Sequence, residues 1–166
     1  MQRLIKSGEL VNDPWTLLRE ATGPEVLKIV PGKNFIVPLN FWKLYRSEMD
    51  DYAGAFALWL DSHENVADIG EALHDLPLIA LNFPAFSDGR AYTNARELRE
   101  FYEYKGEIRA IGDVLRDQLY YMMRCGFDAF EIRHDQDPES CLKAFSDFQT
   151  GYQASIDQPQ PLFRRR

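Results

Sequence analysis

The chain has 166 residues, of which 45% are hydrophobic and 27% charged, and its formal net charge is −7. This length and composition are typical of one globular domain with a sizeable core, and the acidic balance disfavours generic binding to nucleic acid or to an anionic membrane surface. No run approaches the roughly 20 apolar residues of a membrane span, and no apolar core of signal-peptide length opens the chain, so we expect a cytoplasmic protein.

The first 34 residues are predicted to form a β-hairpin, RLIKSGELVND, and a connection that contains Pro24, Pro31 and Gly32. The stretch NFIVP begins as a strand that Pro38 limits, and residues 39–52 suit a helix or a capping segment. We expect an α/β domain over residues 35–155 and a flexible tail over residues 156–166.

After Gly54 the pattern becomes regular. Short apolar runs at residues 56–60, 78–82, 107–111 and 129–133 are each followed by an amphipathic helical pattern. Asn65 and Asp113 are placed to cap two of these helices, and Gly126 is placed to end one of them. Such repeated βα units predict an α/β fold with a mainly parallel sheet. The pattern leaves open whether the sheet is an open one or part of a barrel.

Cofactor chemistry has little support in the sequence. Cys125 and Cys141 are the only cysteines, and both lie among apolar residues of predicted helices, which favours buried packing. The three histidines have no ligand spacing, so no metal site is predicted. No nucleotide-binding or iron–sulfur motif is present, and the cofactor is unknown.

Functional residues of parallel α/β folds gather at the carboxyl ends of the strands. Here those ends carry Asp61, Asn82, the loop Ser87–Arg90, Asp113, Arg133 and His134. We predict that Asp88, Gly89, Arg90 and Asp113, with Arg109, line a pocket for a small anion. An arginine fork suits an oxyanion, and the helix that follows Gly89 begins with free amide groups. The alternative is that Asp88 and Asp113 only cap helices while Arg90 pairs with a nearby carboxylate.

Arg109 and Glu131 are predicted inside central strands, where a charge is costly unless it is paired. If their strands are neighbours, the two side chains project from the same face and can meet. This pair is either a structural ion pair or part of a site.

Residues Leu76–Arg133 resemble the bacterial family catalogued as domain of unknown function 934. The motifs that carry the resemblance are F-x-DGR-x-Y, EIRAIGDVLRDQ and RCGFDAFE, and the resemblance extends more loosely over residues 35–152. Members of this family are typically encoded beside the genes of sulfite reductase and phosphoadenylyl-sulfate reductase in proteobacteria, and they are often labelled oxidoreductases of sulfite reduction.

The resemblance implies a role in assimilatory sulfate and sulfite reduction but brings no catalytic residues with it. Two functions are compatible with the residues: a small-molecule enzyme, either an oxidoreductase or one unrelated to redox chemistry, and a non-catalytic accessory protein. The implied partners are sulfite reductase or another sulfur-assimilation enzyme, and a small anion.

Overall fold

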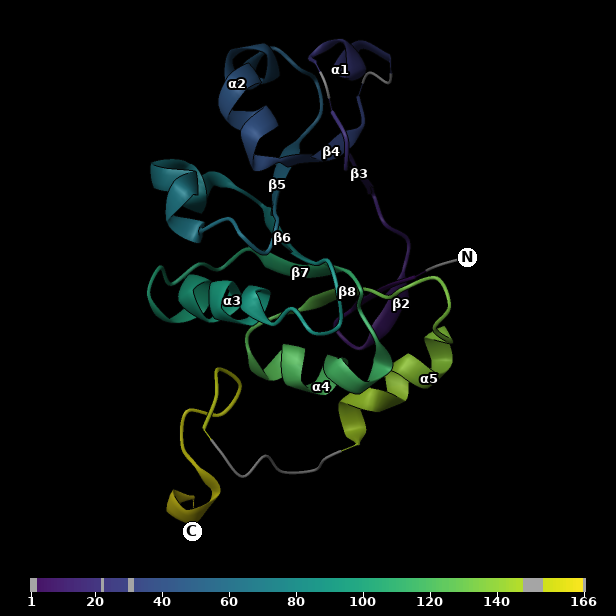
Figure 1. Ribbon diagram of the computed structural model, residues 1–166, viewed down its shortest axis with the longest axis vertical. Coiled ribbons are helices and arrows are strands. Elements are labelled where there is room, and N and C mark those ends of the chain that lie inside the picture. Colours follow the sequence, from purple (N-terminus) through teal and green to yellow (C-terminus); the bar gives the residue numbers. More distant parts are fainter. Residues whose placement is uncertain (1–2, 22, 30–31, 148–153, 166) are drawn as a thin grey trace.

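The computed structural model describes residues 3–21, 23–29, 32–147 and 154–165. The described residues contain eight strands that form one mixed sheet, shown as arrows in Figure 1. In chain order these are β1 (Leu4–Lys6), β2 (Glu9–Val11), β3 (Trp15–Leu17), β4 (Asn34–Pro38), β5 (Phe56–Leu60), β6 (Leu78–Phe83), β7 (Glu107–Gly112) and β8 (Ala129–Glu131).

The helical elements alternate with these strands. The α-helices are α1 (Glu25–Ile29), α2 (Leu39–Asp50), α3 (Arg90–Glu100), α4 (Arg116–Arg124) and α5 (Pro138–Lys143), and the 3-10 segments are η1 (Val66–Asp75), η2 (Ala144–Ser146) and η3 (Leu162–Arg164). None of the helices in the described ranges is long and apolar enough to cross a bilayer.

The order of strands in the sheet is β2-β1-β8-β7-β6-β5-β4-β3. Strands β3 to β8 are all parallel to one another, while β1 is antiparallel to both of its neighbours, β2 and β8. The parallel strands predicted at residues 56–60, 78–82, 107–111 and 129–133 are therefore confirmed, although β8 ends two residues early. The predicted N-terminal hairpin is also confirmed, as β1 and β2.

The sheet curls into a half-barrel (Figure 1). Its two edge strands, β2 and β3, are connected by residues 12–14 alone, a segment that reaches at most about 14 Å. The edges of a flat sheet of eight strands would lie about 34 Å apart. Strands β2 and β3 run in the same direction, so residues 9–17 continue along one line. The start of this segment pairs with β1 and its end pairs with β4. Residues 12–14, the connecting segment, thereby bridge the open side of the half-barrel.

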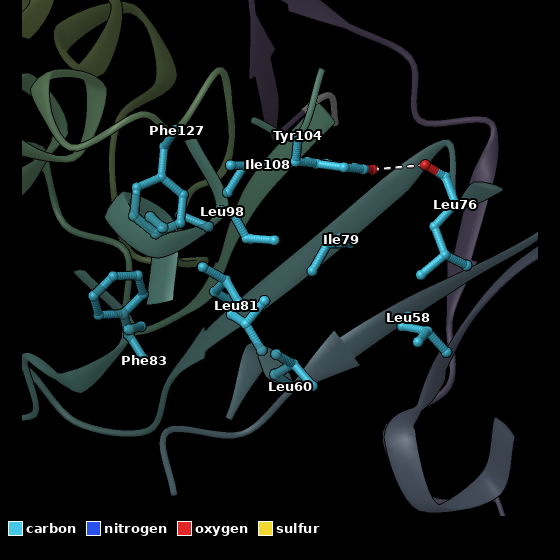
Figure 2. Packing of buried hydrophobic residues seen from close by; sticks show 14 of the residues in the cluster. Leu58, Leu60, Leu76, Ile79, Leu81, Phe83, Leu98, Tyr104, Ile108 and Phe127 are labelled. Carbon is cyan, nitrogen blue, oxygen red and sulfur yellow. Dashed lines mark hydrogen bonds between the residues drawn. The ribbon is translucent and has the colours of Figure 1, made fainter. Parts of the chain in front are cut away.

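Alternate side chains of each strand point to opposite faces of the sheet. The outer face packs against the helices and forms the main core, which includes Leu58, Leu81 and Phe83. In this core, shown in Figure 2, the hydroxyl of Tyr104 donates to the carbonyl of Leu76 at 2.7 Å. The inner face carries a smaller cluster of Ile36, Ala57, Leu78, Ala80 and Ile111, with Trp15, Leu17 and Trp59 packed against it.

Two helices differ from the sequence-based expectation. The segment after Asn65 begins where predicted but forms 3-10 turns instead of one α-helix, and it is interrupted at Gly70, whose φ of 72° fits neither kind of right-handed helix. Its predicted apolar positions Val66, Ile69 and Leu73 are nevertheless buried. Helix α4 begins after Leu115, so Asp113 does not cap it.

Other local expectations are confirmed. Pro138 begins α5, and Asp137 caps this helix by accepting a hydrogen bond from the Ser140 amide. Gly126 has a φ of 112° directly after the C-cap of α4. Cys125 and Cys141 are buried and unpaired.

Candidate functional site

Two polar residues lie at the carboxyl edge of the sheet. Asp61 directly follows β5, and Asn82 lies near the end of the neighbouring strand β6. The Asn82 amide donates to Oδ1 of Asp61 at 3.0 Å, and the Ser62 backbone N–H donates to the same oxygen at 2.8 Å. Oε2 of Glu64 accepts from the Asp61 backbone N–H at 2.7 Å. These hydrogen bonds fix the loop after β5 in one conformation, and they offset part of the negative charge of the Asp61 and Glu64 carboxylates.

The strand register places Glu131 in the same row as this pair. Leu60 pairs with Leu81, Asn82 with Ile111, and Ala110 with Phe130. Continuing the first and last of these pairings by one residue places Asp61 opposite Asn82 and Ile111 opposite Glu131. The four residues Asp61, Asn82, Ile111 and Glu131 thus form one row across β5, β6, β7 and β8. They therefore project from the inner face at one level, near the carboxyl ends.

The chain that leaves β3 lies over this row. The Trp59 indole N–H donates to the Leu18 carbonyl at 2.9 Å, which attaches the segment after β3 to β5. The next residue, Arg19, is exposed and donates from Nη1 to Oδ1 of Asn82 at 3.4 Å. The guanidinium group of Arg19 is thus held above the inner face at the carboxyl end of the half-barrel.

A cavity of about 680 Å³ opens at this end, of a size that holds a small organic molecule. Its lining combines the floor residue Trp59 with five ionisable side chains, and is made of Arg19, Glu20, Ala21, Pro38, Asn40, Trp59, Asp61, His63 and Glu64. Nδ1 of His63 lies 3.7 Å from Oδ2 of Asp61. We refer to this cavity as the carboxyl-end pocket.

Glu131 lies half-buried beside this arrangement. Burial raises the pKa of the Glu131 carboxyl above its ordinary value, while the positive charges of Arg19 and Arg109 lower it and Asp13 raises it. No hydrogen bond joins this carboxylate to another residue of the described chain. A half-buried carboxylate beside a cation and without a fixed partner is the kind of group that changes its protonation state when a ligand binds.

The predicted loop Asp88, Gly89 and Arg90 lies next to the carboxyl-end pocket but does not line it. Arg90 donates from Nη2 to Oδ2 of Asp88 at 2.6 Å and to Oγ of Ser62 at 2.9 Å. The hydrogen bonds from Arg90 hold the pKa of the Asp88 carboxyl well below its usual range. Arg90 therefore pairs with a nearby carboxylate and braces the Ser62 loop, while Gly89 precedes the first residue of α3.

The remaining two predicted site residues lie elsewhere. Arg109 is buried, and it donates to Oε1 of Glu107 and to Oδ2 of Asp13, both at 2.7 Å. It lines a separate cavity of about 230 Å³ on the side of Glu107, at the amino ends of the strands. Asp113 forms an ion pair with Arg133, in which Oδ1 of Asp113 lies 3.3 Å from Nη1 of Arg133. Arg109 and Glu131 do share the inner face, as predicted, but the hydrogen-bonded partners of Arg109 are Glu107 and Asp13.

The sequence does not predict Arg19 or His63 as site residues. The first 34 residues suit a hairpin followed by a connection, and nothing local indicates that the segment after the hairpin pairs with β4. The alternation in WTL, which forms β3, is the one signal that points to a strand there. Within the described ranges, no group of three or more histidine, cysteine or acidic side chains is arranged to hold a metal ion.

Residues 57–163 match the model of a family described as a bacterial protein of unknown function, DUF934. The match covers more than half of the chain. The protein belongs to this family. The DUF934 region contains Asp61, Asn82 and Glu131, whereas Arg19 precedes it. No curated protein matches the chain.

Proposed function

We propose that this DUF934 protein binds a small sulfur oxyanion in the carboxyl-end pocket and serves the sulfite step of assimilatory sulfate reduction, as an accessory protein or as an oxidoreductase. The observation that carries the binding part is the position of Arg19 over the inner face, where its planar fork faces the cavity next to Asn82. An arginine fork matches an oxyanion with two parallel hydrogen bonds. The pathway is supported by the gene neighbourhood that the family resemblance implies.

The charge of the pocket is compatible with an anion despite its three carboxylates. Two of them, Asp61 and Glu64, already accept backbone N–H groups. Glu20 is exposed, where water screens its charge. Arg19 makes one long hydrogen bond to a described side chain, so most of its donors face solvent and the cavity.

A deletion strain tests both parts of the proposal. Without the gene, growth on sulfate or sulfite should fail and growth on sulfide or cysteine should be normal. The wild-type gene and Arg96→Met should restore growth, because Arg96 forms only a surface pair with Glu100 on α3. Arg19→Met, which removes the same charge, should not restore it. Normal growth of the deletion strain on sulfate would contradict the proposed pathway.

A purely non-catalytic partner of sulfite reductase is the second candidate, and the exposed side chain of Phe86 favours it. Phe86 is 60% exposed on the loop between β6 and α3, beside the braced Asp88–Arg90 pair. Exposed aromatic residues on fixed loops are typical of protein interfaces. In the same strain, failure of Phe86→Ser together with full rescue by Arg19→Met would favour this candidate over the pocket.

A further inference from the structure

Glu131 and Arg19 approach the same part of the inner face from opposite sides. Glu131 projects from β8 in the row of Asp61 and Asn82, and Arg19 reaches this row from the segment after β3. The charged groups that act on Glu131 are Arg19, Arg109 of β7 and Asp13 of the connecting segment. Glu131 therefore lies on the inner face under the influence of charges from the segment after β3, from β7 and from the connecting segment.

Only one of the two cations near Glu131 is available to a ligand. Arg109 is 1% exposed and is bound by two carboxylates, those of Glu107 and Asp13. Arg19 is exposed and has no ion pair with another described residue. An anion that enters this end of the half-barrel will therefore bind Arg19. Glu131 lies outside the lining of the carboxyl-end pocket, but it shares the row of Asn82, which Arg19 contacts, and the charge of Arg19 acts on its carboxyl group.

The state of Glu131 then decides how well the anion binds. An ionised Glu131 attracts Arg19 and repels the anion, whereas a protonated Glu131 is neutral and can donate an O–H hydrogen bond to it. The bound anion in turn favours the protonated form, since a like charge nearby disfavours ionisation.

We infer that Arg19 and Glu131 form the two sides of an oxyanion subsite, and that Glu131 takes up a proton when the anion binds. This inference rests on the proposed binding of a small oxyanion in the carboxyl-end pocket. It adds the identity of a second contact residue and a proton linked to binding.

The direction of the pH dependence follows from linkage. Burial already raises the pKa of Glu131 in the free protein, and the bound anion raises it further. Between these two pKa values the complex holds more protons than the free protein, so affinity falls as pH increases. With full coupling the fall approaches about tenfold for each pH unit.

Titration calorimetry with sodium sulfate measures both consequences, because sulfate itself does not titrate in this range. Repeating the titration in buffers of different ionisation enthalpy counts the protons taken up. For the wild type we expect an uptake approaching one proton and an affinity that falls with pH. For Glu131→Gln, which is permanently neutral, we expect no uptake and a nearly constant affinity. The matched control Glu100→Gln, on the surface of α3, should behave as the wild type does.

His63→Asn tests whether the histidine in the lining of the pocket, instead of Glu131, takes up the proton when sulfate binds. We expect this variant to take up a proton as the wild type does. If neither the wild type nor Glu131→Gln binds sulfate at any pH, the proposed anion binding itself is wrong. If both bind with the same pH dependence, or if Arg19→Met binds as tightly as the wild type, the subsite of Arg19 and Glu131 is wrong while anion binding elsewhere stands.

Discussion

Arg109→Met is expected to lower the free energy of unfolding by up to about 3–5 kcal/mol, the cost of breaking a buried ion pair by removing one partner. Arg109 is 1% exposed and bonds Glu107 within its own strand and Asp13 in the connecting segment. Methionine fills a similar volume but leaves the Asp13 carboxylate without an ion pair, while Glu107 keeps Lys6 as its remaining cationic partner. Because Asp13 lies between β2 and β3, the same change also releases the connection that bridges the open side of the half-barrel.

Urea unfolding of Arg109→Met and of Arg96→Met as a surface control measures this effect. Arg96→Met should change the free energy of unfolding by less than about 1 kcal/mol, since its ion pair is exposed. A double variant, Arg109→Met with Asp13→Asn, should recover part of the loss, because Asp13 is the carboxylate that Arg109→Met leaves without an ion pair. An Arg109→Met protein as stable as the Arg96→Met control would show that this ion network contributes nothing to the stability of the fold.

Gly112→Ala is expected to lower both stability and anion binding. Gly112 ends β7 with a φ of +91°, and an added Cβ would meet the Phe83 carbonyl oxygen and, at 2.6 Å, Oδ1 of Asn82. The left-handed backbone alone costs roughly 1–2 kcal/mol in a residue with a side chain. The contact should add about 1–3 kcal/mol, because the Phe83 carbonyl belongs to a central strand and cannot move freely.

Gly8→Ala is the matched control for this substitution. Gly8 has a φ of +78°, and nothing lies within 4 Å of the position of its Cβ. The difference between the two variants in urea unfolding isolates the contact with β6. Gly112→Ala should also weaken sulfate binding in calorimetry, since Asn82 is the hydrogen-bond partner of Arg19. Equal losses of stability in the two variants would mean that the contact with Phe83 and Asn82 is absorbed without cost.

The strands and their direction could be predicted from the sequence because the signals are local. Each of the runs at residues 56–60, 78–82 and 107–111 is short, apolar and followed by turn residues, which is sufficient to indicate a strand of a parallel sheet. The position of Asp61 and Asn82 at the carboxyl edge follows from the same pattern.

The curl of the sheet and the partners of its charged residues could not be predicted in this way. Arg109 pairs with Asp13, which is 96 residues away along the chain, and no periodicity reveals a contact of that separation. The same long-range arrangement brings Arg19 above Asn82, 63 residues further along. The loop Asp88–Arg90 is predicted to be part of a site because its residue types are locally suggestive, and in the structure its charged side chains bind each other and Ser62.

Occupation of the carboxyl-end pocket is measured most directly by the indole N–H resonances in a proton–nitrogen NMR titration with sulfite. Trp59 forms part of the lining and bonds Leu18 next to Arg19, Trp15 lines the amino-end cavity with Arg109, and Trp42 is buried beneath Arg46. We predict that the Trp59 indole resonance shifts in a saturable manner, that the Trp42 and Trp15 resonances stay in place, and that Arg19→Met abolishes the shift. An unmoved Trp59 resonance, or a shift of Trp15 in its place, would contradict a sulfur oxyanion site at the carboxyl ends of the strands.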